Sequence, residues 1–136
     1  MLHVLLHMDV HAGRATSDAI AQMLSTNPVV VRRTMAGLRD AGYVQSEKGH
    51  GGGWVLARPL AEITLLDIHR ALGSPSVFAI GISSDHAECL VERAVNVELG
   101  DALREAEALL LERFDRVTLA DLARSTQQKT RDRPGF

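Results

Sequence analysis

Residues 16–58 read TSDAIAQMLSTNPVVVRRTMAGLRDAGYVQSEKGHGGGWVLAR, and this stretch decides the fold. It opens with a threonine and a serine, both good N-caps, and its apolar spacing predicts a helix over residues 16–25. Asn27 is a natural N-cap and Pro28 a natural first helical residue, so a second helix is expected over residues 28–41. Two helices joined by such a short turn are typical of a helix-turn-helix.

After Gly42, which favours a left-handed helix end, the pattern changes to short strands. Residues 43–46 and 54–57 are predicted to form a β-hairpin, with the glycine-rich residues 47–53 as its turn. Trp54 is expected to pack beneath this hairpin. The order helix, turn, helix, hairpin predicts a winged helix-turn-helix, whose recognition helix enters the major groove of DNA.

The flanking residues complete a fold that is mainly α with a small β-hairpin. Apolar spacing predicts further helices over residues 2–11, 65–72 and 88–114, and a short one over 118–123. The chain is therefore divided into a winged helix-turn-helix DNA-binding domain at 1–72, a linker or sensor loop at 73–87, dimerisation helices at 88–123 and a disordered tail at 124–136.

The long C-terminal helix is expected to join two copies of the chain. Apolar residues recur along it at helical spacing, although Gly100 weakens the pattern locally. The predicted dimer interface consists of Val95, Leu99, Leu103, Ala106, Leu110 and Phe114.

Charge is distributed unevenly along the chain, although the net charge is only -2. Residues 28–58 carry five basic and two acidic side chains, whereas residues 59–123 carry twelve acidic and five basic ones. The tail from 124 onward has a surplus of bases. An acidic body with a basic head is typical of a protein that binds a polyanion on one local face.

Helical geometry predicts which side of the recognition helix faces DNA. Val31, Met35 and Leu38 share one face and are expected to be buried. The outward residues are then Val29, Arg32, Arg33 and Ala36. An arginine can bind a guanine edge in a bidentate manner, and a valine can contact a thymine methyl group. The alternative is that the paired arginines belong to an ordinary solvated face.

The candidate DNA-binding residues combine this helix with its cap, the preceding helix and the wing: Ser17, Asn27, Val29, Val30, Arg32, Arg33, Lys48, His50 and Gly51. In the wing, the basic side chains can reach phosphate, and the glycines allow a close backbone approach. The turn does not match a dinucleotide-binding loop, because GHGGGW lacks the GxGxxG spacing and a strand follows it.

The segments NPVVVRR, LRDAGYV, KGHGGGWVLARP and ITLLDI, in this order, resemble the Rrf2 family of bacterial transcriptional regulators. The resemblance covers roughly residues 2–72 and is greatest to the YwnA-like branch. It implies a homodimer, joined by its long helices, that binds a double-stranded, near-palindromic operator, with repression as the expected effect. It also implies DNA contacts at Val29, Arg32, Arg33 and Lys48.

The signal that the chain senses is not evident from its sequence. Family members that bind an iron–sulfur cluster carry three closely spaced cysteines after the fourth helix, whereas this chain has one cysteine, Cys89. No cofactor is therefore expected. Cys89 is either a redox sensor or a quiet packed cysteine. His3, His7 and His11 share a helix face, and His86 lies near Cys89, but neither set completes a metal site.

Two rival functions remain beside a DNA-binding regulator: a redox- or metal-responsive sensor, and a winged-helix module that binds proteins. Catalysis is not expected, because no nucleophile, base and orienting group form a pattern. No apolar run reaches the roughly 18 residues of a membrane span, and the N-terminus lacks signal-peptide features. A single cysteine fits a reducing compartment, so a cytoplasmic location without membrane contact is predicted.

Overall fold

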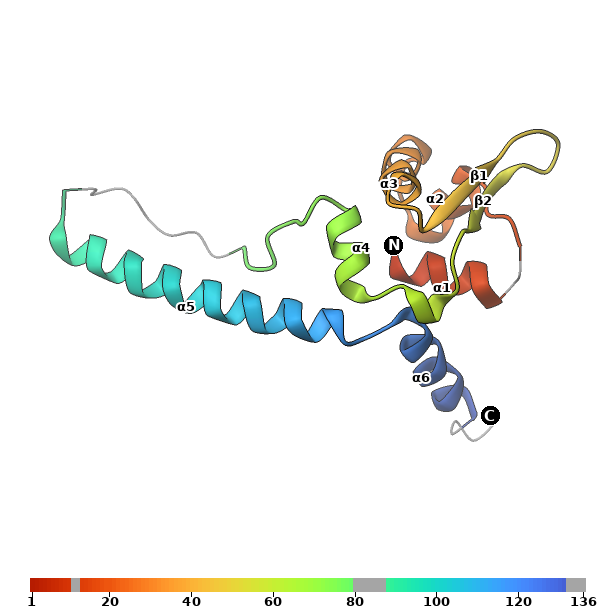
Figure 1. Cartoon of the computed structure of the whole chain (residues 1–136). Coiled ribbons are helices and arrows are strands. Elements are labelled where there is room, and N and C mark those ends of the chain that lie inside the picture. Colours follow the sequence, from red (N-terminus) through yellow and green to blue (C-terminus); the bar gives the residue numbers. More distant parts are fainter. Residues whose placement is uncertain (11–12, 80–87, 132–136) are drawn as a thin grey trace.

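In the computed structural model, which describes residues 1–10, 13–79 and 88–131, a long helix projects from a head of short helices and one hairpin (Figure 1). The elements of the head are α1 (Leu2–Val10), α2 (Ser17–Leu24), α3 (Pro28–Asp40), β1 (Val44–Glu47), β2 (Gly53–Leu56), the 3-10 turn η1 (Leu60–Glu62) and α4 (Leu65–Ala71). The projecting helix is α5 (Leu90–Asp115), and α6 (Leu119–Arg131) follows it. This arrangement confirms the prediction of a mainly α, winged helix-turn-helix fold.

The caps predicted from sequence define the helix-turn-helix. The Thr16 hydroxyl accepts a hydrogen bond of 3.1 Å from the Ala19 amide at the start of α2. The Asn27 carboxamide oxygen accepts one of 2.8 Å from the Val29 amide, with Pro28 as the first residue of α3. Each cap satisfies an amide that has no partner within its helix, so both helices begin where local chemistry predicts.

The hairpin pairs Val44 with Leu56 and Glu47 with Gly53, about one residue away from the predicted strand limits. A third segment joins its edge, because Ala15 forms an isolated antiparallel bridge with Trp54. Trp54 is 8% exposed, and its indole N–H donates to the Ser17 hydroxyl at 3.0 Å. The prediction that Trp54 packs beneath the hairpin is thus confirmed.

One hydrophobic core connects the elements of the head. The nine most completely buried side chains come from α1, α2, α3, β1, α6 and the residue after η1: Val4, Leu5, Ile20, Val31, Met35, Leu38, Val44, Ile63 and Leu119. Helices α3 and α4 cross closely at Gly37, where a Cβ would lie 2.8 Å from the carbonyl oxygen of Ala71. This glycine sets how near the recognition helix lies to its neighbour.

The C-terminal helix α6 belongs to the core of the head, although residues 118–123 were expected to help form the dimer. Leu119 is 0% exposed, and its amide donates to the carbonyl of Ile63 at 2.8 Å. The segments that precede α4 and α6 form a bridge between Thr64 and Thr118. This contact joins residues far apart in the chain, so no local sequence pattern predicts it.

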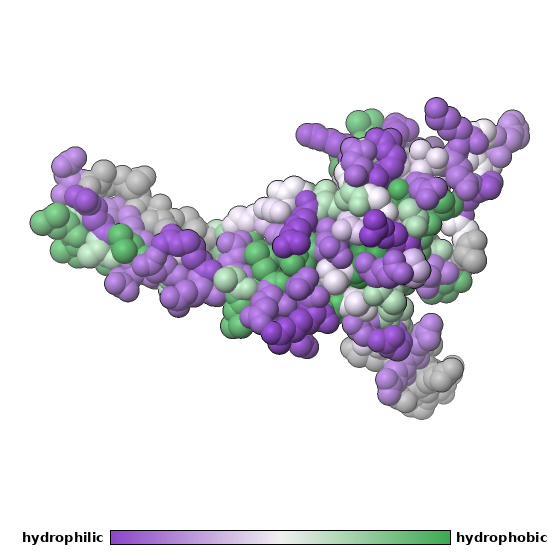
Figure 2. Space-filling model, viewed as in Figure 1, coloured by the Kyte–Doolittle hydropathy of each residue, from purple (hydrophilic) through white to green (hydrophobic). Residues whose placement is uncertain are grey.

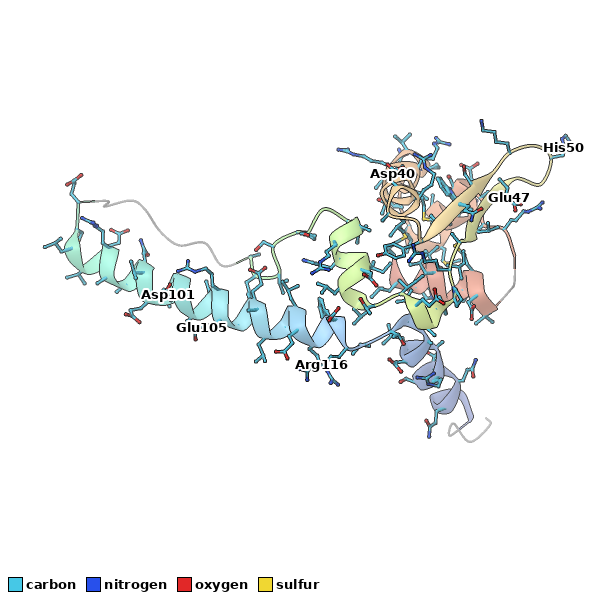
Figure 3. The ribbon with its side chains drawn as sticks, in the orientation of Figure 1. Asp40, Glu47, His50, Asp101, Glu105 and Arg116 are labelled. Carbon is cyan, nitrogen blue, oxygen red and sulfur yellow. The ribbon has the colours of Figure 1, made fainter. Side chains whose placement is uncertain are left out.

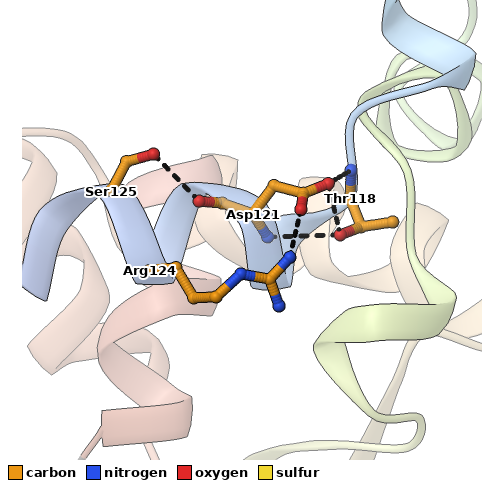
Figure 4. A network of polar contacts seen from close by, with 4 residues as sticks. All are labelled: Thr118, Asp121, Arg124 and Ser125. Carbon is orange, nitrogen blue, oxygen red and sulfur yellow. Dashed lines mark hydrogen bonds and ion pairs between the residues drawn. The ribbon is translucent and has the colours of Figure 1, made fainter.

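Both α4 and α6 begin with a threonine that exchanges hydrogen bonds with an aspartate three residues later. Thr64 and Asp67 form a capping box at α4. At α6, the Thr118 amide donates to Asp121 at 2.9 Å, and the Asp121 amide donates to the Thr118 hydroxyl at 3.2 Å (Figure 4). The motif T-L-x-D marks both starts, so both helices are specified locally.

Helix α6 continues to Arg131, well into the segment 124–136 that was predicted to be disordered. That prediction rested on the lack of an apolar face. Polar contacts along the helix extend it instead: Arg124 pairs with Asp121, and the Ser125 hydroxyl donates to the Asp121 carbonyl at 3.0 Å (Figure 4). Residues 132–136 lie outside the described residues.

Helix α5 begins at Leu90, two residues later than predicted, and most of its length lies away from the head as an arm (Figure 1). Residues 73–79 of the predicted linker form no helix or strand, and residues 80–87 lie outside the described residues. None of the helices in the described ranges combines the length and hydropathy needed to cross a membrane.

Candidate nucleic-acid interface

The N-terminal half of α3 presents apolar and cationic side chains to solvent. Val29 is 62% exposed and Val30 is 53% exposed, whereas Val31 behind them is buried. Arg32 and Arg33 are also exposed. The predicted buried face is therefore observed, and of the residues predicted to face outward Val29, Arg32 and Arg33 are exposed, whereas Ala36 is half-buried. If these two exposed valines contact base edges, their apolar surface is removed from water. This burial favours binding in a groove of DNA.

The two arginines of this face are available to an incoming anion. In the described part of the chain, neither Arg32 nor Arg33 takes part in an ion pair, whereas Arg39 pairs with Asp40 at 2.9 Å. Asp40 lies at the C-terminal end of α3 (Figure 3). Positive charge is thus concentrated toward the start of the helix, where backbone amides also favour phosphate.

The wing carries its basic groups at the turn. Lys48, His50 and Gly51 are exposed, and His50 lies at the tip of the loop (Figure 3). The turn closes through a hydrogen bond of 2.9 Å from the Gly52 amide to the Gly49 carbonyl. Position 52 requires glycine, because a Cβ there would lie 2.4 Å from the carbonyl oxygen of Glu47.

Two candidate DNA contacts already have structural partners in the free chain. The Ser17 hydroxyl accepts the indole N–H of Trp54, and the Asn27 side chain caps α3. Ser17 is half-buried and Asn27 is exposed. The first bond joins β2 to α2, and the second fixes the start of α3.

Hydrophilic residues cover much of the head around α3 and the hairpin, whereas apolar residues reach the surface at the far end of α5 (Figure 2). Two side chains of the predicted dimer stripe are half exposed: Val95 at 49% and Leu99 at 50%. Two others are turned partly toward their own chain, since Leu110 is half-buried and Phe114 packs its ring 6.3 Å from that of His69.

Exposed apolar side chains of α5 also lie outside the predicted stripe. Val91 is 72% exposed and Leu109 is 70% exposed, while Leu90 at 76% and Val97 at 59% lie on another side of the helix. Val91 and Leu109, together with four residues at helical spacing, form the arm face, defined as Val91, Val95, Leu99, Ala102, Ala106 and Leu109. Sequence spacing alone could not show which side of the stripe α4 covers.

The candidate sensing residues that the structure describes lie on α1 and at the start of α5. Cys89 is exposed and is the N-cap residue of α5, without a side-chain capping bond. On α1 the rings of His3 and His7 lie 4.4 Å apart, edge to face. His11 and His86 lie outside the described residues. Among the residues that the structure describes, no three His, Cys, Asp or Glu side chains are grouped to hold a metal.

Arg14 also belongs to this region, although it lies between the helices predicted over residues 2–11 and 16–25. It contacts the wing from the segment between α1 and α2. No local motif marks it, and its partners are more than thirty residues away.

Comparison with known proteins identifies the kind of protein that carries this interface. The family model described as "Rrf2: Iron-dependent Transcriptional regulator" matches residues 1–125. YwgB of Bacillus subtilis, named as an HTH-type transcriptional regulator, is 39% identical over 72 residues, which are 53% of this chain and 46% of YwgB. The match thus spans about half the length of that relative.

Two further comparisons extend along most of the chain. YwnA of Bacillus subtilis, also named as an HTH-type transcriptional regulator, is 26% identical over 123 residues, 89% of this chain and 90% of YwnA. A crystal structure described as a transcriptional regulator from Lactobacillus plantarum superposes with a TM-score of 0.74 at 25% identity, covering 93% of this chain and 86% of that one. The chain, with its winged head, its exposed recognition helix and a family match along nearly its whole length, belongs to the Rrf2 family of transcriptional regulators.

Proposed function

We propose that the chain acts as a homodimer that binds a near-palindromic operator in the cytoplasm and represses transcription by occupying it. The observation that carries the proposal is the outward face of α3, where two exposed valines adjoin two arginines without ion-pair partners in the described chain. Such a face offers both the apolar and the bidentate contacts that read base edges. Repression requires nothing beyond occupancy of the promoter.

The outward residues of α3 are proposed to make different contacts along the major groove. Val29, Arg33 and Ala36 follow one another at spacings of four and three residues, so they point toward the same groove floor. Arg33 is placed for a guanine edge, a contact worth about 1–3 kcal/mol of discrimination. Val29 is placed for a thymine methyl group, and the small Ala36 permits close approach. Asp40, one turn further, repels the backbone and limits the stripe to the first turns.

Phosphate contacts come from the flanks of this stripe. Arg32 lies beside it on α3, and Lys48 and His50 extend from the wing. Contacts of this kind position the protein on the duplex without reading sequence. The proposal therefore separates a specific contribution from α3 and a largely sequence-independent one from the wing.

The arm face is the proposed dimer interface. Its six residues, Val91 to Leu109, are spaced three or four apart, which makes a continuous stripe on a helix of 26 residues, about 39 Å long. Two alanines in the middle of the stripe allow two helices to approach closely. A two-fold dimer would present its two recognition helices to half-sites about 34–36 Å apart.

Footprinting on the DNA upstream of the gene tests operator binding. We expect two protected segments about one duplex turn apart, and weaker protection with Arg33→Ala. Arg116→Ala is the matched control, because Arg116 is an exposed arginine in an ion pair on the arm, away from α3. Uniform protection of unrelated DNA would instead favour a protein-interaction module with nonspecific affinity.

Sedimentation of a matched pair of variants tests the dimer. Leu99→Glu places a charge in the arm face, whereas Ala108→Glu places the same charge on the opposite side of α5, at another exposed position. We expect the first variant to dissociate at concentrations where the wild type and the second remain dimeric. Equal behaviour of the two variants would assign the dimer to another surface.

A redox response is a second candidate function, favoured by the exposure of Cys89 at the start of the proposed dimer helix. Oxidation there could alter how two arms meet. The Cys89→Ser variant is expected to bind the operator normally and to keep it in the presence of oxidant. Release of the operator from wild type and variant alike would eliminate the thiol as the switch.

A further inference from the structure

Arg14 contacts both sides of the wing tip from outside the hairpin. Its Nε forms an ion pair with the carboxylate of Glu47, the last residue of β1. Its Nη1 donates a hydrogen bond of 3.2 Å to the carbonyl oxygen of Gly51, within the turn. One guanidinium thus connects the end of a strand to the loop that follows it.

The backbone next to Arg14 is fixed to the opposite strand. The Ala15 amide donates to the Trp54 carbonyl at 3.1 Å, and the Trp54 amide donates to the Ala15 carbonyl at 2.9 Å. The Trp54 ring is in turn buried against the head and bonded to Ser17. Arg14 therefore extends from a segment that is held against the head, and its contacts fix the wing tip relative to the head.

The wing tip lies beyond the backbone pairing of the two strands, so the strand ladder does not hold it in place. The last strand pair joins Glu47 to Gly53, so residues 48–52 lie beyond the ladder. Three of these five residues are glycines, and Gly49 and Gly51 have positive φ angles of 101° and 77°. A glycine-rich turn has many accessible backbone conformations, and a side chain that fixes one carbonyl removes much of that freedom.

The same ion pair balances the charge of the wing. Glu47 immediately precedes Lys48, and both are exposed near the surface proposed to meet phosphate. An unpaired carboxylate at that point would oppose the attraction of Lys48 and His50 for DNA. The guanidinium of Arg14 neutralises it before DNA arrives.

We propose that Arg14 is a positioning residue for DNA binding. It holds the wing tip through Gly51 and cancels the charge of Glu47, so that Lys48 and His50 are already in position when they contact the DNA phosphates. This inference rests on the proposed function, but the contact between Arg14 and the wing tip can be tested in the free protein. Direct binding of Arg14 to phosphate is the rival explanation, and the two predict different couplings with Glu47.

Amide hydrogen exchange without DNA tests the clamp itself. Arg14→Ala is expected to speed exchange of the Gly52 amide, which donates to the Gly49 carbonyl in the turn, by about twofold to fivefold, the effect of losing exposed polar contacts. The control Arg116→Ala removes another exposed, ion-paired arginine and should leave this amide unchanged. Unchanged exchange in Arg14→Ala would overturn the clamp, whether or not the protein binds DNA.

A double-mutant cycle with Glu47→Gln then tests positioning for DNA. We expect Arg14→Ala to weaken operator binding about fivefold in the wild-type background. In the Glu47→Gln background the loss should be about twofold or less, because that variant has no carboxylate for Arg14 to neutralise. An equal loss in both backgrounds would show that cancelling the charge of Glu47 contributes nothing to operator binding, and would overturn the inference. Faster exchange with unchanged operator affinity would show that the clamp does not serve DNA binding, and would also overturn the inference.

Discussion

Truncation of Leu119 to alanine tests whether α6 is part of the DNA-binding head. The side chain is 0% exposed and belongs to the same core as α1 and α3, although it follows the arm in sequence. The substitution removes three carbon atoms, or about 2.4 kcal/mol of transfer free energy at about 0.8 kcal/mol per methylene. With the cavity that remains, the free energy of unfolding should fall by about 3 kcal/mol, within the range of about 2–5 for such changes.

Urea unfolding followed by circular dichroism measures this loss. With an m-value of about 2 kcal/mol/M, the midpoint of unfolding should fall by about 1.5 M. The control is Leu72→Ala, the same substitution at a side chain that is 40% exposed, which should cost less than about 1 kcal/mol. All variants are compared at one protein concentration, because dimerisation would add to apparent stability. A loss no larger than that of the control would refute the assignment of α6 to the head.

Three further substitutions test the local interactions that shape the head. Asn27→Ala removes the cap of α3 and should cost about 1 kcal/mol of stability and weaken operator binding, whereas Asn27→Ser should preserve both; equal affinities in a titration would contradict this. Gly37→Ala places a Cβ 2.8 Å from the carbonyl oxygen of Ala71, so overpacking of about 1–3 kcal/mol should outweigh a helix-propensity gain of up to about 1, and a raised melting temperature would contradict it. Burial acts to raise the pKa of Asp67, but hydrogen bonds from Thr64 outweigh it and leave that pKa below its ordinary value. The stabilisation is therefore present above the unfolded pKa and lost as pH falls below about 4, and Asp67→Asn should flatten this part of a stability–pH curve.

Local chemistry allowed most of the head to be predicted from sequence. Asn27 and Pro28 fixed the start of α3, and the spacing of Val31, Met35 and Leu38 fixed its buried face. The side chains left outside by that face are the exposed valines and arginines of the proposed interface. Each of these inferences depends on residues within a few positions of one another.

What the sequence could not show depends on contacts between distant segments. Leu119 reaches the core through Ile63, and Arg14 reaches the wing through Glu47, in both cases across more than thirty residues. The side of α5 that stays exposed also depends on contacts between distant segments. Periodicity locates an apolar stripe on α5, but only the packing of Phe114 beside α4 shows which flank stays exposed.

The equilibrium affinity of the full chain for its selected operator, compared with a scrambled duplex of equal length, tests the central claim most directly. The wild type should prefer the operator by at least about a thousandfold, and the logarithm of its affinity should fall linearly with the logarithm of the salt concentration. Arg33→Ala should lose about fivefold to a hundredfold on the operator and little on the scrambled duplex, whereas Arg116→Ala should change neither. Equal affinities for the two duplexes, or an Arg33→Ala variant that retains the full preference for the operator, would contradict the assignment of α3 as the recognition helix.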